Sequence, residues 1–320
     1  MNFRTLLTCA AIIGLWGHVA AAETYPARPI HLIVGFPAGG STDSVARLLG
    51  KGISDDLGQP VVVENRPGAG GEIALQYGAK AAPDGYTLML VTGSSSTLGL
   101  VRKVSFDIER DFVPIAEVAV SPQILTVTPS LPVKSVADLV ALARKEPGKL
   151  TYGTSGVGTP SHLAGVMFDQ IAKVVTTHVP YKGSSENILG VASGNISMSY
   201  TDATSVLPLL QSGKVRALGV TTAARASFLP DIPTLDESGL KGLVLPLWFG
   251  VSAPTGTPES VIKRLSAAIE KTMSAPETKT SLNKFGIDPQ FSPAGQFKAF
   301  IHNELKKNAE LIKLSGMKIQ

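Results

Sequence analysis

Short apolar runs alternate with segments of helical periodicity along most of the chain. Runs such as residues 30–34 and 86–91 have the continuous apolar content of strands that helices cover on both faces. Between them, apolar residues recur every three or four positions, as on a helix with one buried face. This alternation predicts an α/β fold. Strands are expected at 30–34, 60–64, 86–91, 124–127, 196–202, 215–221 and 247–251, and helices at 72–82, 135–144, 259–274 and 293–314.

Two of the expected strands run into glycine-rich turns that open a helix. The first turn is Phe36-Pro37-Ala38-Gly39-Gly40-Ser41-Thr42-Asp43, and the second is Ser155-Gly156-Val157-Gly158-Thr159-Pro160-Ser161-His162. Such a turn leaves backbone N–H groups at the positive end of a helix dipole, where anions bind. A glycine turn can also be a plain connection, but the recurrence and the density of Ser and Thr hydroxyls favour binding. We therefore expect both turns, one from each half of the chain, to hold one small anionic ligand.

Composition narrows the classes of function. The chain has 320 residues, enough for two α/β domains with substantial cores. Its 29 Lys and Arg nearly balance its 25 Asp and Glu, which gives a net charge of +4. Because no run of basic residues follows the pattern that tracks phosphates, nucleic-acid binding is not expected.

The first 22 residues are typical of an export signal. Arg4 provides a positive charge, residues 6–16 form an apolar stretch too short to span a membrane, and Ala20-Ala21-Ala22 matches a cleavage site. We expect an exported protein cleaved near Ala22. The single cysteine, Cys9, would leave with the signal, so the mature chain has no disulfide.

The turns do not match the common enzyme motifs. The first lacks the Lys-Ser/Thr ending of a phosphate-binding loop and the spaced glycines of a dinucleotide fingerprint. The second resembles a nucleophile elbow around Ser155 but has Val157 in place of the last glycine. His162 could contact a ligand or could cap and pack its own helix. An exported serine hydrolase using Ser155 and His162 is therefore the enzymatic alternative, while no metal or cofactor site is predicted.

Three further groups have two interpretations each. Tyr181-Lys182 and Arg66 could supply a cation to the ligand, or be a solvated lysine and an arginine that pins its own turn. Asp202, at a strand end, could receive an amino or hydroxyl group of the ligand, or cap the next helix.

Several motifs resemble those of the Bug-type solute receptors of tripartite tricarboxylate transporters. The likeness covers essentially the whole mature chain in order. It rests on Tyr25-Pro26-x-Arg28-Pro29-Ile30, Gly35-Phe36-Pro37-Ala38-Gly39-Gly40-Ser41-Thr42-Asp43, Val63-Glu64-Asn65-Arg66-Pro67-Gly68-Ala69-Gly70-Gly71, Ala82-Pro83-Asp84-Gly85-Tyr86-Thr87-Leu88, His178-Val179-Pro180-Tyr181-Lys182-Gly183 and Trp248-Phe249-Gly250.

The resemblance implies a periplasmic binding protein of type II, with two doubly wound α/β lobes joined by two crossover strands. On this basis residues 1–22 are the signal peptide, 23–123 and 222–320 the first lobe, and 124–221 the second. Such a receptor is a monomer that captures a small carboxylate and delivers it to membrane permease subunits; a sensory, ligand-presenting protein is the alternative.

The resemblance also implies which residues hold the ligand. In the family, the two glycine turns grip one carboxylate through N–H groups and hydroxyls. Where the family often has Phe-Asp-Asn, this chain has Tyr200-Thr201-Asp202, which changes the contacts expected there. The expected ligand-binding residues are Phe36, Ala38, Gly39, Gly40, Ser41, Thr42, Asp43, Ser155, Gly156, Gly158, Thr159, His162, Tyr181, Thr201 and Asp202.

Overall fold

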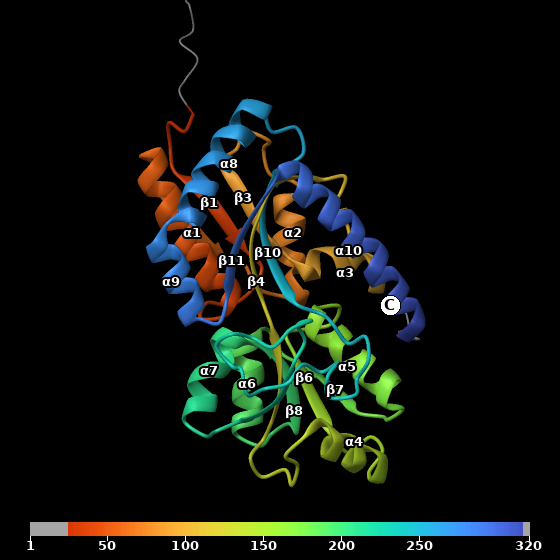
Figure 1. Cartoon of the computed structure of the whole chain (residues 1–320). Coiled ribbons are helices and arrows are strands. Elements are labelled where there is room, and N and C mark those ends of the chain that lie inside the picture. The colour runs from red at the N-terminus through yellow and green to blue at the C-terminus, as the bar shows by residue number, and fades with distance from the viewer. Residues whose placement is uncertain (1–24, 316–320) are drawn as a thin grey trace, which may run out of the picture.

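Two β-sheets, one above the other in Figure 1, form the two lobes of the molecule. The computed structural model describes residues 25–315, so the predicted signal peptide lies outside the described residues. The first sheet has the strand order β11-β4-β10-β3-β1-β2. Its strands are β1 (Ile30–Val34), β2 (Val61–Asn65), β3 (Thr87–Thr92), β4 (Phe112–Ser121), β10 (Leu247–Pro254) and β11 (Asp288–Pro293).

The second sheet has the strand order β7-β6-β8-β5-β9. Here β6 is parallel to β7 and β8, while β5 is antiparallel to β8 and β9. In the first sheet β1 is parallel to β2 and β3, and β10 is antiparallel to its neighbours. The strands of the second sheet are β5 (Gln123–Val127), β6 (Thr151–Thr154), β7 (Thr177–Pro180), β8 (Met198–Asp202) and β9 (Arg216–Val220).

Helices cover both faces of each sheet. In the first lobe, α1 and α8 bury apolar residues on one face, and α2, α3 and α10 do so on the other. In the second lobe, α4 and α5 cover one face, and α6 and α7 the other. The helices are α1 (Ser41–Leu57), α2 (Glu72–Gly78), α3 (Gly93–Val101), α4 (Val136–Lys145), α5 (Pro160–Ala172), α6 (Ser184–Ala192), α7 (Ala203–Gln211), α8 (Glu259–Ser274), α9 (Pro276–Lys284) and α10 (Ala294–Ser315), with a short 3₁₀ turn at Ala69–Gly71. None of those described is long and apolar enough to cross a membrane.

The chain passes between the lobes twice. The first crossing is Pro122, where β4 of the first sheet runs directly into β5 of the second. The lobe boundary predicted at residue 222 places the return crossing at the end of the strand predicted at 215–221, but β9 pairs with β5 and stays in the second sheet. The return occurs instead just before β10, because residues 221–245 pack on the second lobe: the amide of Leu245 donates to the Thr221 carbonyl, and Leu235 and Leu243 lie in that lobe's core. This packing differs from the lobe boundary predicted at residue 222.

Besides the two crossings of the chain, the C-terminal helix also connects the lobes. Helix α10 starts on the first sheet, where Phe297 and Ile301 are buried, and runs diagonally down to the second lobe (Figure 1). There Ile312 joins the apolar cluster that contains Leu163 and Phe168 of α5. The lobes are thus bridged along one side by a helix as well as by strands.

Candidate functional site

A cavity lies between the lobes, where the carboxyl ends of strands from both sheets meet. It has a volume of about 60 Å³ and receives side chains or backbone from β1, β3 and β10 above and from β5 to β8 below. Its lining is Phe36, Pro37, Gly40, Ser41, Thr42, Thr92, Ser94, Gln123, Ser155, Thr159, Pro160, Ser161, Gly183, Ser184, Ser185, Glu186, Tyr200, Asp202, Leu247 and Phe249.

The first glycine turn opens α1 at the cavity. Gly40 is the N-cap residue with an extended backbone, and no side chain caps the helix there. Gly39 has φ +90°, a left-handed conformation that requires glycine or a strained residue. Consequently, no side-chain cap accepts a hydrogen bond from the first N–H groups of α1, which lie at the cavity.

Asp43 holds this turn from behind and is not part of the lining. Its carboxylate accepts hydrogen bonds from the Gly39 N–H (3.1 Å), from Asn65 (3.0 Å) and from Arg47 (2.9 Å). Burial alone would raise the pKa of Asp43, but the hydrogen bonds from Arg47, Asn65 and Gly39 outweigh it and lower the pKa. The residue therefore stabilises the turn as an ionised carboxylate.

The second glycine turn opens α5 on the opposite side of the cavity. Thr159 is the N-cap residue and Pro160 begins the helix. The Thr159 hydroxyl donates to the Gly156 carbonyl (2.7 Å), and the Ser155 N–H donates to the Ser161 hydroxyl (3.0 Å). No side chain caps α5, so its N-terminus is also available to a ligand.

Ser155 and His162 do not form a nucleophile–base pair in the described residues. The Ser155 hydroxyl lies 3.1 Å from that of Ser184, which links the α5 turn to the start of α6. His162 accepts the Gly158 N–H at its Nδ1 (3.2 Å) and stacks on His178 with ring centroids 4.1 Å apart. Burial lowers the pKa of His162 to about 4. His162 thus packs behind the turn, and the arrangement required of a serine hydrolase is not formed.

Three more helices begin at the cavity. Helix α6 starts after Gly183 without a side-chain cap, whereas α3 is closed by a capping box of Thr92 and Ser95. Helix α7 is capped by Asp202, which accepts the Ser205 N–H (3.1 Å). The positive ends of α1, α5 and α6 therefore remain open to an anion, while α7 already holds a carboxylate.

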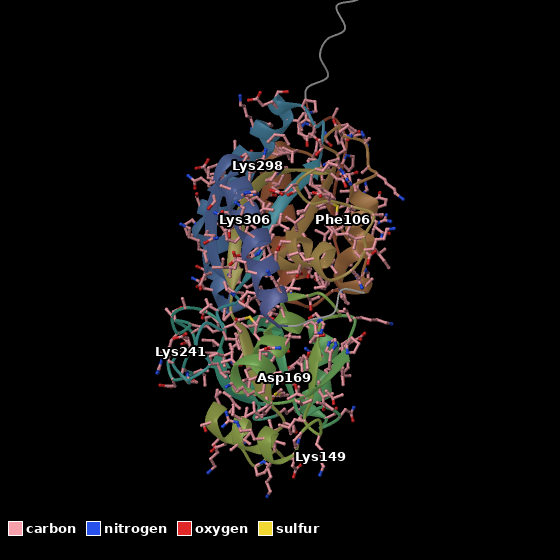
Figure 2. The ribbon with its side chains drawn as sticks, turned by 90° about the vertical axis from the view of Figure 1, so that its right-hand side faces the viewer. Phe106, Lys149, Asp169, Lys241, Lys298 and Lys306 are labelled. Carbon is pink, nitrogen blue, oxygen red and sulfur yellow. The ribbon has the colours of Figure 1, made fainter. Side chains whose placement is uncertain are left out.

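The lining contains no Lys or Arg. Its carboxylate side chains are Asp202, which is buried, and Glu186, which is exposed. Figure 2 shows Lys149 and Lys241 on the second lobe and Lys298 and Lys306 on α10, and none of these four lysines belongs to the lining. Any anion in the cavity would be held by neutral dipoles, not by an ion pair.

Arg66 and Lys182, the two residues considered as a source of positive charge for the ligand, do not line the cavity. Arg66 pairs with Glu64 (2.9 Å) and lies over the Tyr77 ring, so it pins its own turn. Lys182 is exposed and does not line the cavity. Among residues 25–315, no three His, Cys, Asp or Glu side chains lie close enough together to hold a metal ion.

The structure brings part of the expected ligand-binding set to this one cavity. The members in the lining are Phe36, Gly40, Ser41, Thr42, Ser155, Thr159 and Asp202. The expected residues outside the lining are Ala38, Gly39, Asp43, Gly156, Gly158, His162, Tyr181 and Thr201. Thr201 points to the other face of β8, where it accepts a hydrogen bond from Asn187 (3.1 Å), and Tyr181 packs against the core under α6.

Several lining residues were not predicted. Thr92 and Ser94 belong to a polar segment at the end of a strand, and Ser184 follows a Gly at the start of a helix. The local sequence at each of these three residues therefore indicates a position near a helix N-terminus. Gln123 reaches the cavity only because the chain crosses between the lobes beside it. Nothing in the local sequence indicates that.

The lobes are in contact around the cavity. A Cβ on Gly183 would lie 2.8 Å from Cδ of Pro37, and a Cβ on Gly93 would lie 2.6 Å from Cγ of Pro160. The Thr97 hydroxyl of the first lobe donates to the Gly158 carbonyl of the second. Glycine at positions 93 and 183 therefore permits a closed arrangement of the lobes.

Comparison with known proteins identifies similar chains over nearly the whole length. A model of the family described as "Tripartite tricarboxylate transporter family receptor" matches residues 45–317. Protein BugT of Bordetella pertussis is 34% identical over 326 aligned residues, which cover 100% of both chains. The solved structure of R. palustris Rpa4515 with adipate has a TM-score of 0.88 and 36% identity, covering 91% of this chain and 98% of that one. The structure of the periplasmic binding protein BugD has a TM-score of 0.89 and 32% identity, covering 92% and 100%.

Proposed function

Because the chain belongs to the family of tripartite tricarboxylate transporter receptors, we propose that it captures a small organic carboxylate between its two lobes. It is a solute-binding receptor, and the proposed ligand position is the cavity described above. The observation that carries this proposal is the meeting of three uncapped helix N-termini, those of α1, α5 and α6, in a lining without Lys or Arg.

Neutral dipoles supply enough free energy for this task. Each helix end stabilises an anion by roughly 0.3–1 kcal/mol, and by about 2 kcal/mol where partly buried. Charge-assisted hydrogen bonds from N–H and hydroxyl groups add roughly 1.5–3 kcal/mol each. Several such contacts reach the roughly −8 kcal/mol that corresponds to micromolar affinity. The similar protein Rpa4515 has an organic carboxylate, adipate, in its solved structure.

Export and delivery complete the proposed role. The N-terminal signal would direct the chain to the periplasm and be cleaved near Ala22. The mature receptor would act as a monomer and present its closed, loaded form to the membrane permease subunits of a tripartite tricarboxylate transporter. Mass determination of the mature protein tests the cleavage site, and uptake by vesicles that contain the permease, with and without the receptor, tests the delivery.

The binding itself is tested by native mass spectrometry of protein purified from the periplasm. The expected result is a bound organic acid that is released on unfolding and that rebinds to refolded protein in a calorimeter. Co-purification of no acid, together with no heat from any mono-, di- or tricarboxylate at millimolar concentration, would contradict the proposal.

A further inference from the structure

We propose that the ligand carries a hydrogen-bond donor that binds to Asp202, and that this donor is an ammonium group in preference to a hydroxyl. The carboxylate of the same ligand is held by the N-termini of α1, α5 and α6. This inference rests on the proposed function and specifies its ligand as an amino acid in the broad sense, not a dicarboxylate. The observation behind this inference is the kind of side chains that line one side of the cavity.

Strand order separates two sides of the cavity. Along the edge of the second sheet the order is β7-β6-β8-β5, so the starts of α6 and α5 come first. Asp202 at the end of β8 and Gln123 at the start of β5 come next, and these two residues are paired in register. The open helix ends and the acidic side chain therefore occupy neighbouring, different parts of the same lining.

The second part is rich in acceptors. Asp202 is buried and lines the cavity. Gln123 donates its side-chain Nε2 to the Leu245 carbonyl (3.0 Å), which leaves Oε1 as the acceptor on the other branch of the amide. Since no Lys or Arg lines the cavity, a second ligand carboxylate beside Asp202 would meet a like charge with no compensating cation. An ammonium group there would pair with Asp202.

A hydroxyl across the cavity also lacks a protein partner. Ser94, in the first turn of α3, is 2% exposed, and its Oγ has no hydrogen-bond partner among the described residues although it lines the cavity. Buried hydroxyls without a partner are uncommon in folded proteins, so this one is expected to bond to a ligand or to water beside it. The cavity therefore offers a ligand a further hydrogen-bonding group, in addition to the three open helix N-termini.

Asp202 can cap α7 and still accept a hydrogen bond from a ligand. Its carboxylate accepts the Ser205 N–H (3.1 Å) and the Ser205 hydroxyl (3.4 Å). A carboxylate has about four acceptor positions, so it can accept a ligand donor as well. Asparagine caps helices about as well as aspartate does. Asp202→Asn therefore removes the charge and keeps the cap, and an unchanged melting temperature checks that the fold is retained.

The test compares matched ligands on the refolded, ligand-free protein by calorimetry. Succinate, glutarate and adipate are paired with 3-aminopropanoate, 4-aminobutanoate and 5-aminopentanoate, in which ammonium replaces one carboxylate; neutral α-amino acids are added. For the wild type we expect the tightest ligand to carry an ammonium group and to bind at least tenfold more tightly than the diacid of its series. In Asp202→Asn this preference should fall at least tenfold. Asp231→Asn, at an exposed acid of the second lobe that lies outside the lining, serves as the matched control and should change the preference less than threefold.

The outcomes separate this inference from the proposed function. If a diacid binds most tightly, or if Asp202→Asn leaves the preference unchanged, the inference is wrong while the receptor function stands. If neither series binds to the wild type and no other carboxylate does, the proposed function fails together with it.

Discussion

Gly40 occupies the point at which α1 opens into the cavity. An ideal Cβ at this position meets no atom within 4 Å, so the space beside it is free for a ligand. Gly40→Asp would place a carboxylate where the ligand's carboxylate is expected, and aspartate is itself a favourable N-cap, so the fold should be retained. We expect affinity for the co-purifying acid to fall at least 100-fold in calorimetry.

A matched control exists at the start of another helix. Gly295 lies in the first turn of α10, is exposed, and likewise has no atom within 4 Å of an ideal Cβ. Gly295→Asp should change the affinity less than twofold. Equal affinities of the wild type and Gly40→Asp would show that the start of α1 does not hold the ligand.

At the residue scale, sequence reasoning locates what local turn chemistry determines. Gly40, Ser41 and Thr159 reach the cavity because a glycine turn after a strand places its hydroxyls and N–H groups at the sheet edge. Gln123 could not be found this way, since its position depends on where the chain crosses between the sheets. Alternation along β8 explains why Asp202 faces the cavity and Thr201 does not.

Helix α5 is joined to β7 by a pair of partly buried histidines. His162 stacks on His178, whose Nε2 lies 2.7 Å from the Thr154 hydroxyl. The pKa of each ring is lowered to about 4, by burial in both cases and, for His178, also by the proximity of His162. Between about pH 6.5 and pH 4 the unfolded chain therefore binds protons that the folded chain excludes.

We expect the free energy of unfolding to fall as pH drops from 7 to 5, because protons favour the unfolded state in this window. The loss should flatten near pH 4, where the folded histidines begin to protonate. His178→Gln, which keeps a polar partner for Thr154, should reduce the loss between pH 7 and pH 5 by on the order of 1 kcal/mol. Urea unfolding at three pH values measures it, and parallel pH curves for the two proteins would refute this assignment.

At the element scale, hydrophobic periodicity predicts the long amphipathic helices and the buried strands. Helix α8 and strand β1 match the expected ranges. Helix α3 has no counterpart among the expected helices, because its buried serines and threonines give no apolar stripe. Strand β11 was missed because Pro289 and Pro293 interrupt it, which an edge strand tolerates.

Closure of the lobes depends on a close approach between Gly183 and Pro37. The backbone of Gly183 is extended, so valine is tolerated there locally, but its side chain would collide with Pro37 across the cavity. Gly183→Val should therefore disfavour the closed form without unfolding either lobe. Small-angle scattering should show the wild type becoming more compact on adding ligand, and Gly183→Val remaining expanded with at least tenfold weaker binding.

Identical scattering curves for the wild type with and without ligand would contradict a clamshell mechanism. Compaction of Gly183→Val equal to that of the wild type would instead remove Gly183 from the closure interface. The melting temperature of the ligand-free variant should match that of the wild type, which shows that any loss of binding does not arise from unfolding.

At the scale of the whole molecule, the sequence predicts two α/β lobes of the type II binding-protein fold, and the comparisons confirm this class. The path between the lobes was harder to predict. Residues 221–245 show no clear hydrophobic periodicity, so their packing on the second lobe follows from tertiary contacts of Leu235 and Leu243. The descent of α10 onto α5 likewise depends on contacts between segments far apart in the sequence.

The most direct test of the account is the crystal structure of the protein with its co-purified acid. The account predicts one ligand carboxylate within hydrogen-bond distance of N–H or hydroxyl groups at the starts of both α1 and α5, one from each lobe, with no Lys or Arg in contact. A ligand bound elsewhere, or a carboxylate held by one lobe alone or by a basic side chain, would contradict it.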